Sequence, residues 1–149
     1  MKNLYEPAAV QEVKQRLDRL GPASAPLWGK MNSAQMMAHI AEQFEMVMSR
    51  AFPPRSLAGR VFGRFAKPIT VNEKPFPRST PTDKAFAISD DRDFETERKR
   101  LSNSIDEFSS AGPAGCTKHP HSFFGHLTAQ EWARLMYKHL DHHLRQFGV

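Results

Sequence analysis

The sequence predicts an all-α protein arranged as a four-helix bundle. Four segments carry apolar residues at spacings of three and four, and capping or stop signals bound each of them. Strand signals are weak by comparison, because the apolar runs 69–71 and 86–88 are too short for a sheet core and prolines surround the first. Amphipathic helices with little else bury their apolar faces against one another, as in helix bundles.

The first predicted helix begins near Pro7, which suits a first helical turn, and stops at Gly21-Pro22. The second begins at Asn32 or Ser33, with Gln35 in capping-box register, and ends before the prolines at 53 and 54. Both have a clear apolar stripe, formed in the first by Val10, Val13, Leu17 and Leu20 and in the second by Met36, Met37, Ile40, Phe44, Val47 and Met48.

The third predicted helix starts within residues 89–91 and stops at Gly112-Pro113. The fourth opens with the capping box Thr128-Ala129-Gln130-Glu131 and runs almost to residue 149. Their stripes are Phe94, Leu101, Ile105 and Phe108 in the third, and Trp132, Leu135, Met136, Leu140, Leu144 and Phe147 in the fourth.

A long insert separates the second and third helices. It covers about residues 51–88, contains six prolines and exceeds the usual connection length, so it is either a crossover or a functional lid. A short helix is expected at 57–65. The basic charge is concentrated here: residues 50–79 hold seven cationic side chains and one acid, whereas the whole chain has a net charge of +5.

Length and composition narrow the class of protein. The 149 residues suffice for one domain, 1–149, with a proper core. The single cysteine, Cys116, excludes an internal disulfide and an all-cysteine zinc site. No apolar run reaches the length of a membrane span, and residues 1–7 lack the apolar region of a signal peptide, so we expect a cytoplasmic protein.

The histidines of the fourth helix suggest a metal site. His139 and His143 are four residues apart, which separates them by about 40° on the face that carries the apolar stripe. Such a pair can chelate a divalent ion, and His39 is the one histidine in the other predicted helices that could add a third ligand. His142 points about 100° away. The alternative is that the buried imidazoles are satisfied by ordinary hydrogen bonds.

Other arrangements are weaker. The chain has no Glu-x-x-His, His-Glu-x-x-His, Gly-x-Ser-x-Gly or phosphate-binding loop motif. Cys116 near His119 and His121 could form a nucleophile and base, but a structural thiol is favoured. His119, His121 and His126 could form a second metal patch, although polar loop residues explain them more simply.

The arrangement of histidines on the second and fourth predicted helices resembles that of the DinB-like superfamily of metal-binding four-helix bundles. Members place one histidine on the second helix and His-x-x-x-His on the last, followed by x-x-Gln, which corresponds here to His39, His139, His143 and Gln146. Residues 28–32 and 124–128 also look like an uncharacterised branch of that superfamily, whereas the basic insert is not part of its general pattern.

The resemblance implies a metal-dependent enzyme. Characterised relatives look like thiol-dependent enzymes, namely bacillithiol S-transferases and a mycothiol-dependent maleylpyruvate isomerase, so we expect S-transfer or isomerisation at a divalent metal, zinc or nickel. Three neutral imidazoles leave a coordination position open for water or a thiol, and metal-dependent hydrolysis is the alternative. The expected partners are a small-molecule substrate, a low-molecular-weight thiol and a second copy in a homodimer.

A non-catalytic binding module is the competing class. Residues 56–67 mix Leu57, Val61, Phe62 and Phe65 with cations, so the insert 50–79 could contact anionic membranes or phosphates. The simplest alternative is a solvated basic loop. A nucleic-acid partner is not favoured, because the positive charge is confined to this insert.

Overall fold

The computed structural model of the chain describes residues 2–48, 56–78 and 87–149. Over these residues it contains helices and one isolated β-bridge but no strand, which confirms the all-α prediction. The described helices are α1 (Pro7–Leu17), α2 (Ser33–Val47), α3 (Leu57–Ala66), α4 (Pro68–Val71), α5 (Phe94–Ala111), the 3₁₀ turn η2 (Gly112–Gly115) and α6 (Ala129–Gln146).

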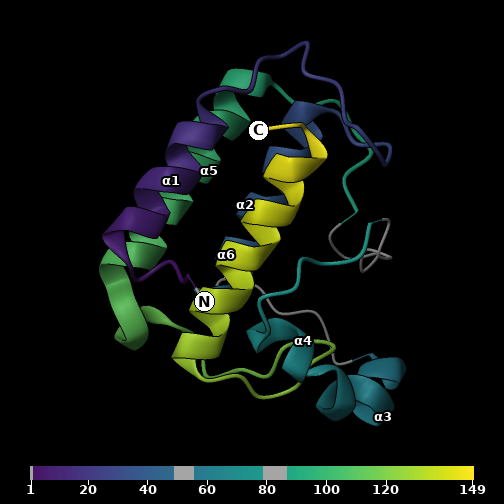
Figure 1. Cartoon of the computed structure of the whole chain (residues 1–149), viewed down its shortest axis with the longest axis vertical. Coiled ribbons are helices and arrows are strands. Elements are labelled where there is room, and N and C mark those ends of the chain that lie inside the picture. The colour runs from purple at the N-terminus through teal and green to yellow at the C-terminus, as the bar shows by residue number, and fades with distance from the viewer. Residues whose placement is uncertain (1, 49–55, 79–86) are drawn as a thin grey trace.

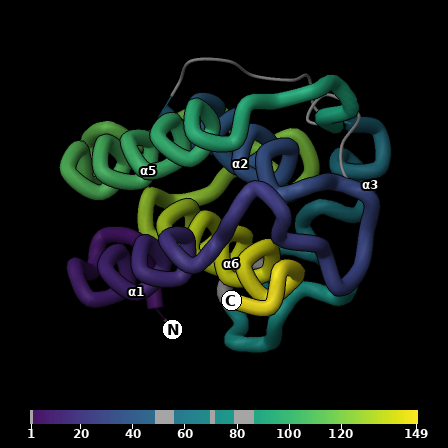
Figure 2. The backbone as a smooth tube through the Cα atoms, turned by 90° about the horizontal axis from the view of Figure 1, so that it is seen from above, coloured from purple at the N-terminus to yellow at the C-terminus, as the bar shows by residue number. Residues whose placement is uncertain are grey.

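The four longer helices surround a shared core. Figure 2 shows α1 and α6 in one layer and α2 and α5 in the other. Each of these helices contacts its neighbour in the same layer and one helix in the opposite layer, so α2 touches α5 and α6, and α1 does the same. Helices α3 and α4 lie outside this arrangement, beside the N-terminal half of α6 (Figure 1).

Helix α2 is the most deeply buried of the four. Eleven of its residues are buried, and its contact with α5 is the most extensive between any two of these helices. Its apolar side chains meet those of the other long helices in one cluster, whose largest fully buried members include Phe44, Phe108, Trp132, Met36, Met37 and Met136. A polar residue on α2 that faces α6 is therefore enclosed by this core.

Helix ends follow the predicted capping signals closely. Both capping boxes form: Asn32 accepts from the backbone N–H of Gln35, and Thr128 accepts from that of Glu131. Two boundaries were predicted wrongly. Helix α1 ends at Leu17 rather than at Gly21, and α5 begins at Phe94, because Asp93 accepts from the N–H of Thr96 and caps the helix there.

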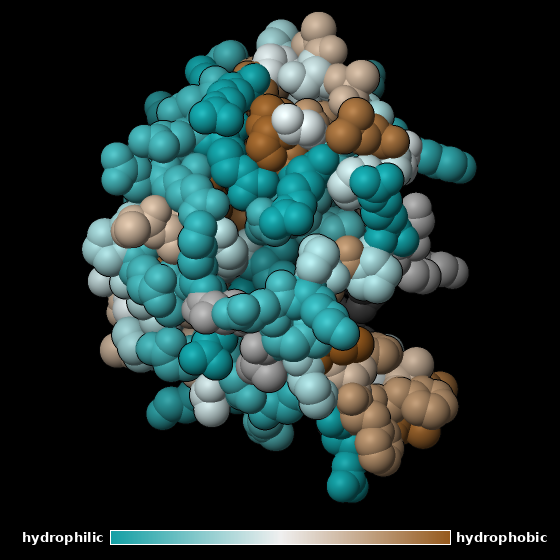
Figure 3. Space-filling view, in the orientation of Figure 1, coloured by the Kyte–Doolittle hydropathy of each residue, from teal (hydrophilic) through white to brown (hydrophobic). Residues whose placement is uncertain are grey.

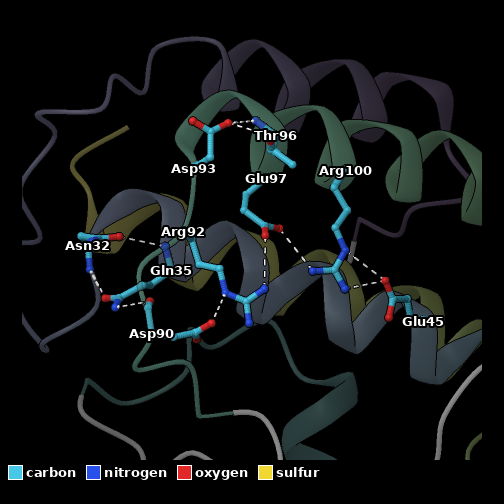
Figure 4. A network of polar contacts seen from close by, with 9 residues as sticks. All are labelled: Asn32, Gln35, Glu45, Asp90, Arg92, Asp93, Thr96, Glu97 and Arg100. Atoms are coloured by element: carbon cyan, nitrogen blue, oxygen red, sulfur yellow. Dashed lines mark hydrogen bonds and ion pairs between the residues drawn. The ribbon is translucent and has the colours of Figure 1, made fainter.

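A polar network fastens α5 to α2 (Figure 4). Glu97 is 5% exposed and pairs with both Arg92 and Arg100, while Arg100 also binds Glu45 of α2 at 2.5 Å. At the other end of α2, Gln35 donates to the backbone carbonyl of Asp90. Because these contacts hold both ends of α2, they fix the position of the helical segment between them, which carries His39.

The described part of the insert is more helical than the sequence suggested. The predicted short helix at 57–65 is present as Leu57–Ala66. The run Ile69–Val71, considered as a weak strand, is part of the helical turn α4. The other weak strand signal, at 86–88, begins at a residue outside the described ranges. Among the described residues, no helix is long and apolar enough to cross a membrane.

Candidate metal centre

The structure brings His139 and His143 together on one face of α6. Their Nε2 atoms lie 3.0 Å apart, and their ring centroids are separated by 4.7 Å. This follows from the helix geometry, because residues four apart are stacked over one another on the same face. The face is the one that packs toward the core, where Trp132, Met136 and Leu140 are buried.

His39 approaches this pair from α2. Its Nε2 atom is 3.2 Å from Nε2 of His139, and its ring centroid is 5.1 Å from the centroids of both partners. Ligand atoms of all three residues lie within 4.8 Å of one another. His39 is not one of the residues of the predicted apolar stripe of the second helix, yet its side chain is enclosed: it is 3% exposed.

The spacing of these nitrogens fits one tetrahedral ion. Bonds of about 2.0–2.1 Å and tetrahedral angles place two ligating nitrogens about 3.3–3.4 Å apart. The observed separations of 3.2 and 3.0 Å are close to that value. Over the described residues, no other group of three His, Cys, Asp or Glu side chains has ligand atoms close enough to share an ion. The three-histidine cluster is therefore the candidate metal centre.

The site keeps its imidazoles neutral. Burial, together with the neighbouring His39, lowers the pKa of His143 to about 3. Burial also places the pKa of His139 well below its ordinary value, again with a contribution from the adjacent His143 and His39. A neutral imidazole is the form that binds a metal, because its unprotonated nitrogen supplies the lone pair.

Gln146 sets the orientation of His143. The side-chain oxygen of Gln146 accepts from Nδ1–H of His143 at 2.7 Å, which leaves Nε2 without its proton and directed at the cluster. The amide nitrogen of Gln146 donates to the carbonyl of Trp28 at 2.6 Å, which fixes the amide orientation. Gly29, with φ +84°, leaves room for this amide, since a Cβ there would lie 2.5 Å from it.

Aromatic side chains cover one flank of the centre. His142 is half-buried, and its ring lies 5.8 Å from Trp28 and 6.0 Å from Phe76 of the insert. The guanidinium of Arg78 stacks over Trp28 at 4.5 Å. The insert therefore contributes to the wall beside the histidines, which the sequence alone did not indicate, because no local pattern links Phe76 to α6.

The other candidate residues do not belong to the three-histidine cluster. Cys116 is a buried free thiol, and burial raises its pKa, which does not suit a nucleophile. His119 and His126 are exposed, and Nδ1 of His121 accepts backbone N–H groups of Phe123 and Phe124. These three histidines form no metal-binding group among the described residues.

The positioning role of Gly29 was missed by sequence reasoning. Residues 28–32 are part of the family resemblance, but a single glycine in a loop does not indicate which distant residue it approaches. Its partner, Gln146, lies near the other end of the chain and meets it through the backbone of residues 27 and 28: the N–H of Leu27 also donates to the carbonyl of Gln146.

Comparisons with known proteins identify a family whose description gives no function. No curated protein and no solved structure gives a significant match to the chain. A family model does match, and it covers residues 4–148, so all three histidines and Gln146 lie within it. The chain therefore belongs to the family described as "Protein of unknown function (DUF1569)".

Proposed function

We propose that the protein is a metal-dependent enzyme that binds a divalent ion, zinc or nickel, through His39, His139 and His143. One observation carries this proposal: three imidazoles from two helices, those of His39 and His143 buried and that of His139 half-buried, converge with Nε2 separations of 3.2 and 3.0 Å and with ligand atoms of all three within 4.8 Å of one another. Gln146 holds His143 with its proton on Nδ1, so Nε2 of His143 presents a lone pair toward His139, as metal binding requires.

The proposed reaction is thiol-dependent S-transfer or isomerisation. A divalent ion held by three neutral ligands keeps its full charge and an open position, so it can activate a thiol as a nucleophile at neutral pH. In S-transfer, the thiol proton passes to solvent, the sulfur bonds to an electrophilic carbon, and the group displaced from that carbon leaves. The expected partner is a small molecule, together with a low-molecular-weight thiol.

The side chains of this protein hold and orient the site. Gln146 fixes the tautomer of His143, and Trp28 fixes Gln146 through its carbonyl. Met36 and Met136 each lie three residues before a proposed ligand, on the same face of its helix, and are fully or almost fully buried, so apolar side chains border the histidines on the core side.

We further propose that the four longer helices form a four-helix bundle of the DinB-like superfamily. The two-layer arrangement of α1, α2, α5 and α6 supports this assignment (Figure 2). The positions of the ligands support it too, since they come from α2 and α6 as in the general pattern of that superfamily.

An activity assay with the metal-loaded protein tests the reaction. The protein is reconstituted with zinc or nickel and mixed with cysteine or a cysteine-containing thiol and an aryl halide electrophile. Metal-dependent formation of the thioether, lost in the His143→Ala variant, supports S-transfer. The His126→Ala variant is the matched control, because His126 is exposed and outside the cluster.

Two other results would redirect the proposal. Hydrolysis of an activated ester without any thiol, dependent on the same three histidines, would favour the metal-dependent hydrolase. Absence of both activities in protein that carries a full complement of metal would contradict the enzymatic proposal, and the metal would then have a structural function.

A further inference from the structure

Helix α3 presents its large apolar side chains to solvent. Leu57 is 80% exposed, Phe65 72%, Phe62 61% and Val61 60%. Figure 3 shows the resulting hydrophobic projection at the lower right of the molecule. Ordinary surface helices turn such residues toward the core, so this helix has the reverse arrangement.

Two glycines explain the reversal. Gly59 and Gly63 are one helical turn apart and are buried against the backbone of residues 122–124. A Cβ at Gly63 would lie 2.0 Å from the carbonyl oxygen of Phe123, and one at Gly59 would lie 2.6 Å from that of Ser122. The helix therefore contacts the body through its glycine face, and its bulky residues have no room on that side.

Polar contacts hold both ends of α3 in this orientation. The backbone N–H of Ser56 donates to the carbonyl of Ser122 at 3.1 Å, and the Ser56 side chain caps the helix by accepting from the N–H of Gly59. At the other end, Lys67 pairs with Glu131 at the start of α6, at 3.0 Å. The outward apolar face is thus a fixed feature of the fold.

Cations border this apolar face. Arg60 and Arg64 are exposed and lie one turn apart, on the side of the helix next to Leu57. Residues 56–78 contain five cationic side chains and one acid. A second copy docking face to face would bring the two arginine rows near each other, whereas an anionic surface complements both the charge and the apolar face.

We propose that α3 attaches the protein to the surface of anionic membranes. Phe62, Phe65 and Val61 enter the boundary between headgroups and acyl chains, and Arg60 and Arg64 contact the lipid phosphates. An amphipathic helix that combines phenylalanine and leucine with flanking cations binds in this way, parallel to the membrane plane. The interaction is independent of the metal centre, so it does not rest on the proposed enzymatic function.

Vesicle flotation with the full chain tests the proposal. The probes are vesicles of phosphatidylcholine alone and vesicles that also contain phosphatidylglycerol. The wild-type protein should float with the anionic vesicles, and added salt should release it. The double variant Arg60→Gln/Arg64→Gln should bind roughly 25-fold more weakly, since each cation near an anionic surface contributes about fivefold. The double variant Phe62→Ser/Phe65→Ser should lose more than about tenfold.

Matched control variants distinguish binding through α3 from non-specific binding of the protein to vesicles. Leu27 is 68% exposed and Arg19 is also exposed, both away from α3, so Leu27→Ser and Arg19→Gln should bind like the wild type. All of these substitutions are at exposed positions, and circular dichroism checks that each variant is folded.

Three outcomes would overturn the proposal. The first is equal binding to neutral and anionic vesicles, and the second is equal loss in the control variants. The third is no vesicle binding together with a dimer, measured by analytical ultracentrifugation, that the Phe62→Ser/Phe65→Ser variant abolishes. That result would assign the face to a second copy of the chain.

Discussion

The side-chain oxygen of Gln146 lies 2.7 Å from Nδ1 of His143, and the amide nitrogen of the same residue lies 2.6 Å from the carbonyl oxygen of Trp28. Gln146 is buried, so this amide joins the proposed metal ligand to the loop before α2 without competition from water. The loop thus takes part in holding the tautomer that a metal requires.

The first prediction follows from this link. Replacement Gln146→Ala removes the acceptor for His143 Nδ1–H, so the imidazole loses its fixed orientation. Metal affinity should fall by about 10- to 100-fold, as it does when a partner behind a ligand is removed. Competition with a chromogenic chelator measures the change. The control is Gln130→Ala, an exposed glutamine in the first turn of α6, which should bind metal like the wild type.

Gly29 provides a second, independent test of the same link. Gly29→Ala places a Cβ 2.5 Å from the amide nitrogen of Gln146, at a φ of +84°. Gly112 also has a positive φ, +58°, but a Cβ there meets nothing within 4 Å. Both alanine variants should lose roughly 1–3 kcal/mol of stability through backbone strain. Only Gly29→Ala should also weaken metal binding, and equal affinities in the two variants would contradict the account.

The metal-free protein should lose stability in mild acid. The folded-state pKa of His143 lies near 3 and that of His139 well below its ordinary value, whereas both are near 6.5 in the unfolded chain. Between these values the unfolded state binds more protons, so the free energy of unfolding falls as the pH falls, by up to about 1.4 kcal/mol per pH unit for each histidine.

Denaturant unfolding of the metal-free protein checks this dependence. Above about pH 6.5 these two histidines should give the free energy of unfolding almost no pH dependence. Below that pH the free energy of unfolding should decline steadily. The double variant His139→Ala/His143→Ala should show a smaller slope. An identical slope in the variant would mean that other groups cause the acid sensitivity.

Glu97 should contribute more to stability than its neighbour Glu95. Glu97 is 5% exposed and joins Arg92 and Arg100, so Glu97→Gln leaves two guanidinium groups with a weaker partner, at a cost of about 2 kcal/mol. Glu95 pairs with Arg98 at an exposed position, so Glu95→Gln should cost less than about 0.5 kcal/mol. Chemical denaturation of the two variants compares them directly, and equal losses would contradict the picture in Figure 4.

Local signals predicted much of this fold. The capping boxes at Asn32 and Thr128 depend on residues three positions apart, so the sequence contains everything needed to place these helix starts. The phase of α6 likewise placed His139 and His143 on its buried side, since four residues make slightly more than one turn. The stripe of α2 was less informative for His39, because that helix is buried on more than one side and has no single polar face.

Long-range contacts account for what the sequence did not indicate. Gly59 and Gly63 read as weak points in a helix, because glycine lowers helix propensity, whereas in the fold they allow close approach to residues 122–124. The same holds for Gly29 beside Gln146 and for Phe76 beside His142: each contact joins segments that are distant in the chain, and no local spacing encodes it.

The metal content of protein purified without a histidine tag and without chelators tests the central claim most directly. Wild-type protein should contain about one divalent ion per chain, and the His142→Ala variant should nearly match it, because His142 contacts Trp28 and Phe76 and does not belong to the ligand group. The His143→Ala variant should contain less than about a tenth of that amount, since it loses a ligand from a three-ligand site. Equal metal content in the His142→Ala and His143→Ala variants, or a wild-type protein that neither carries a divalent ion nor takes one up, would contradict the assignment of His39, His139 and His143 as a metal centre.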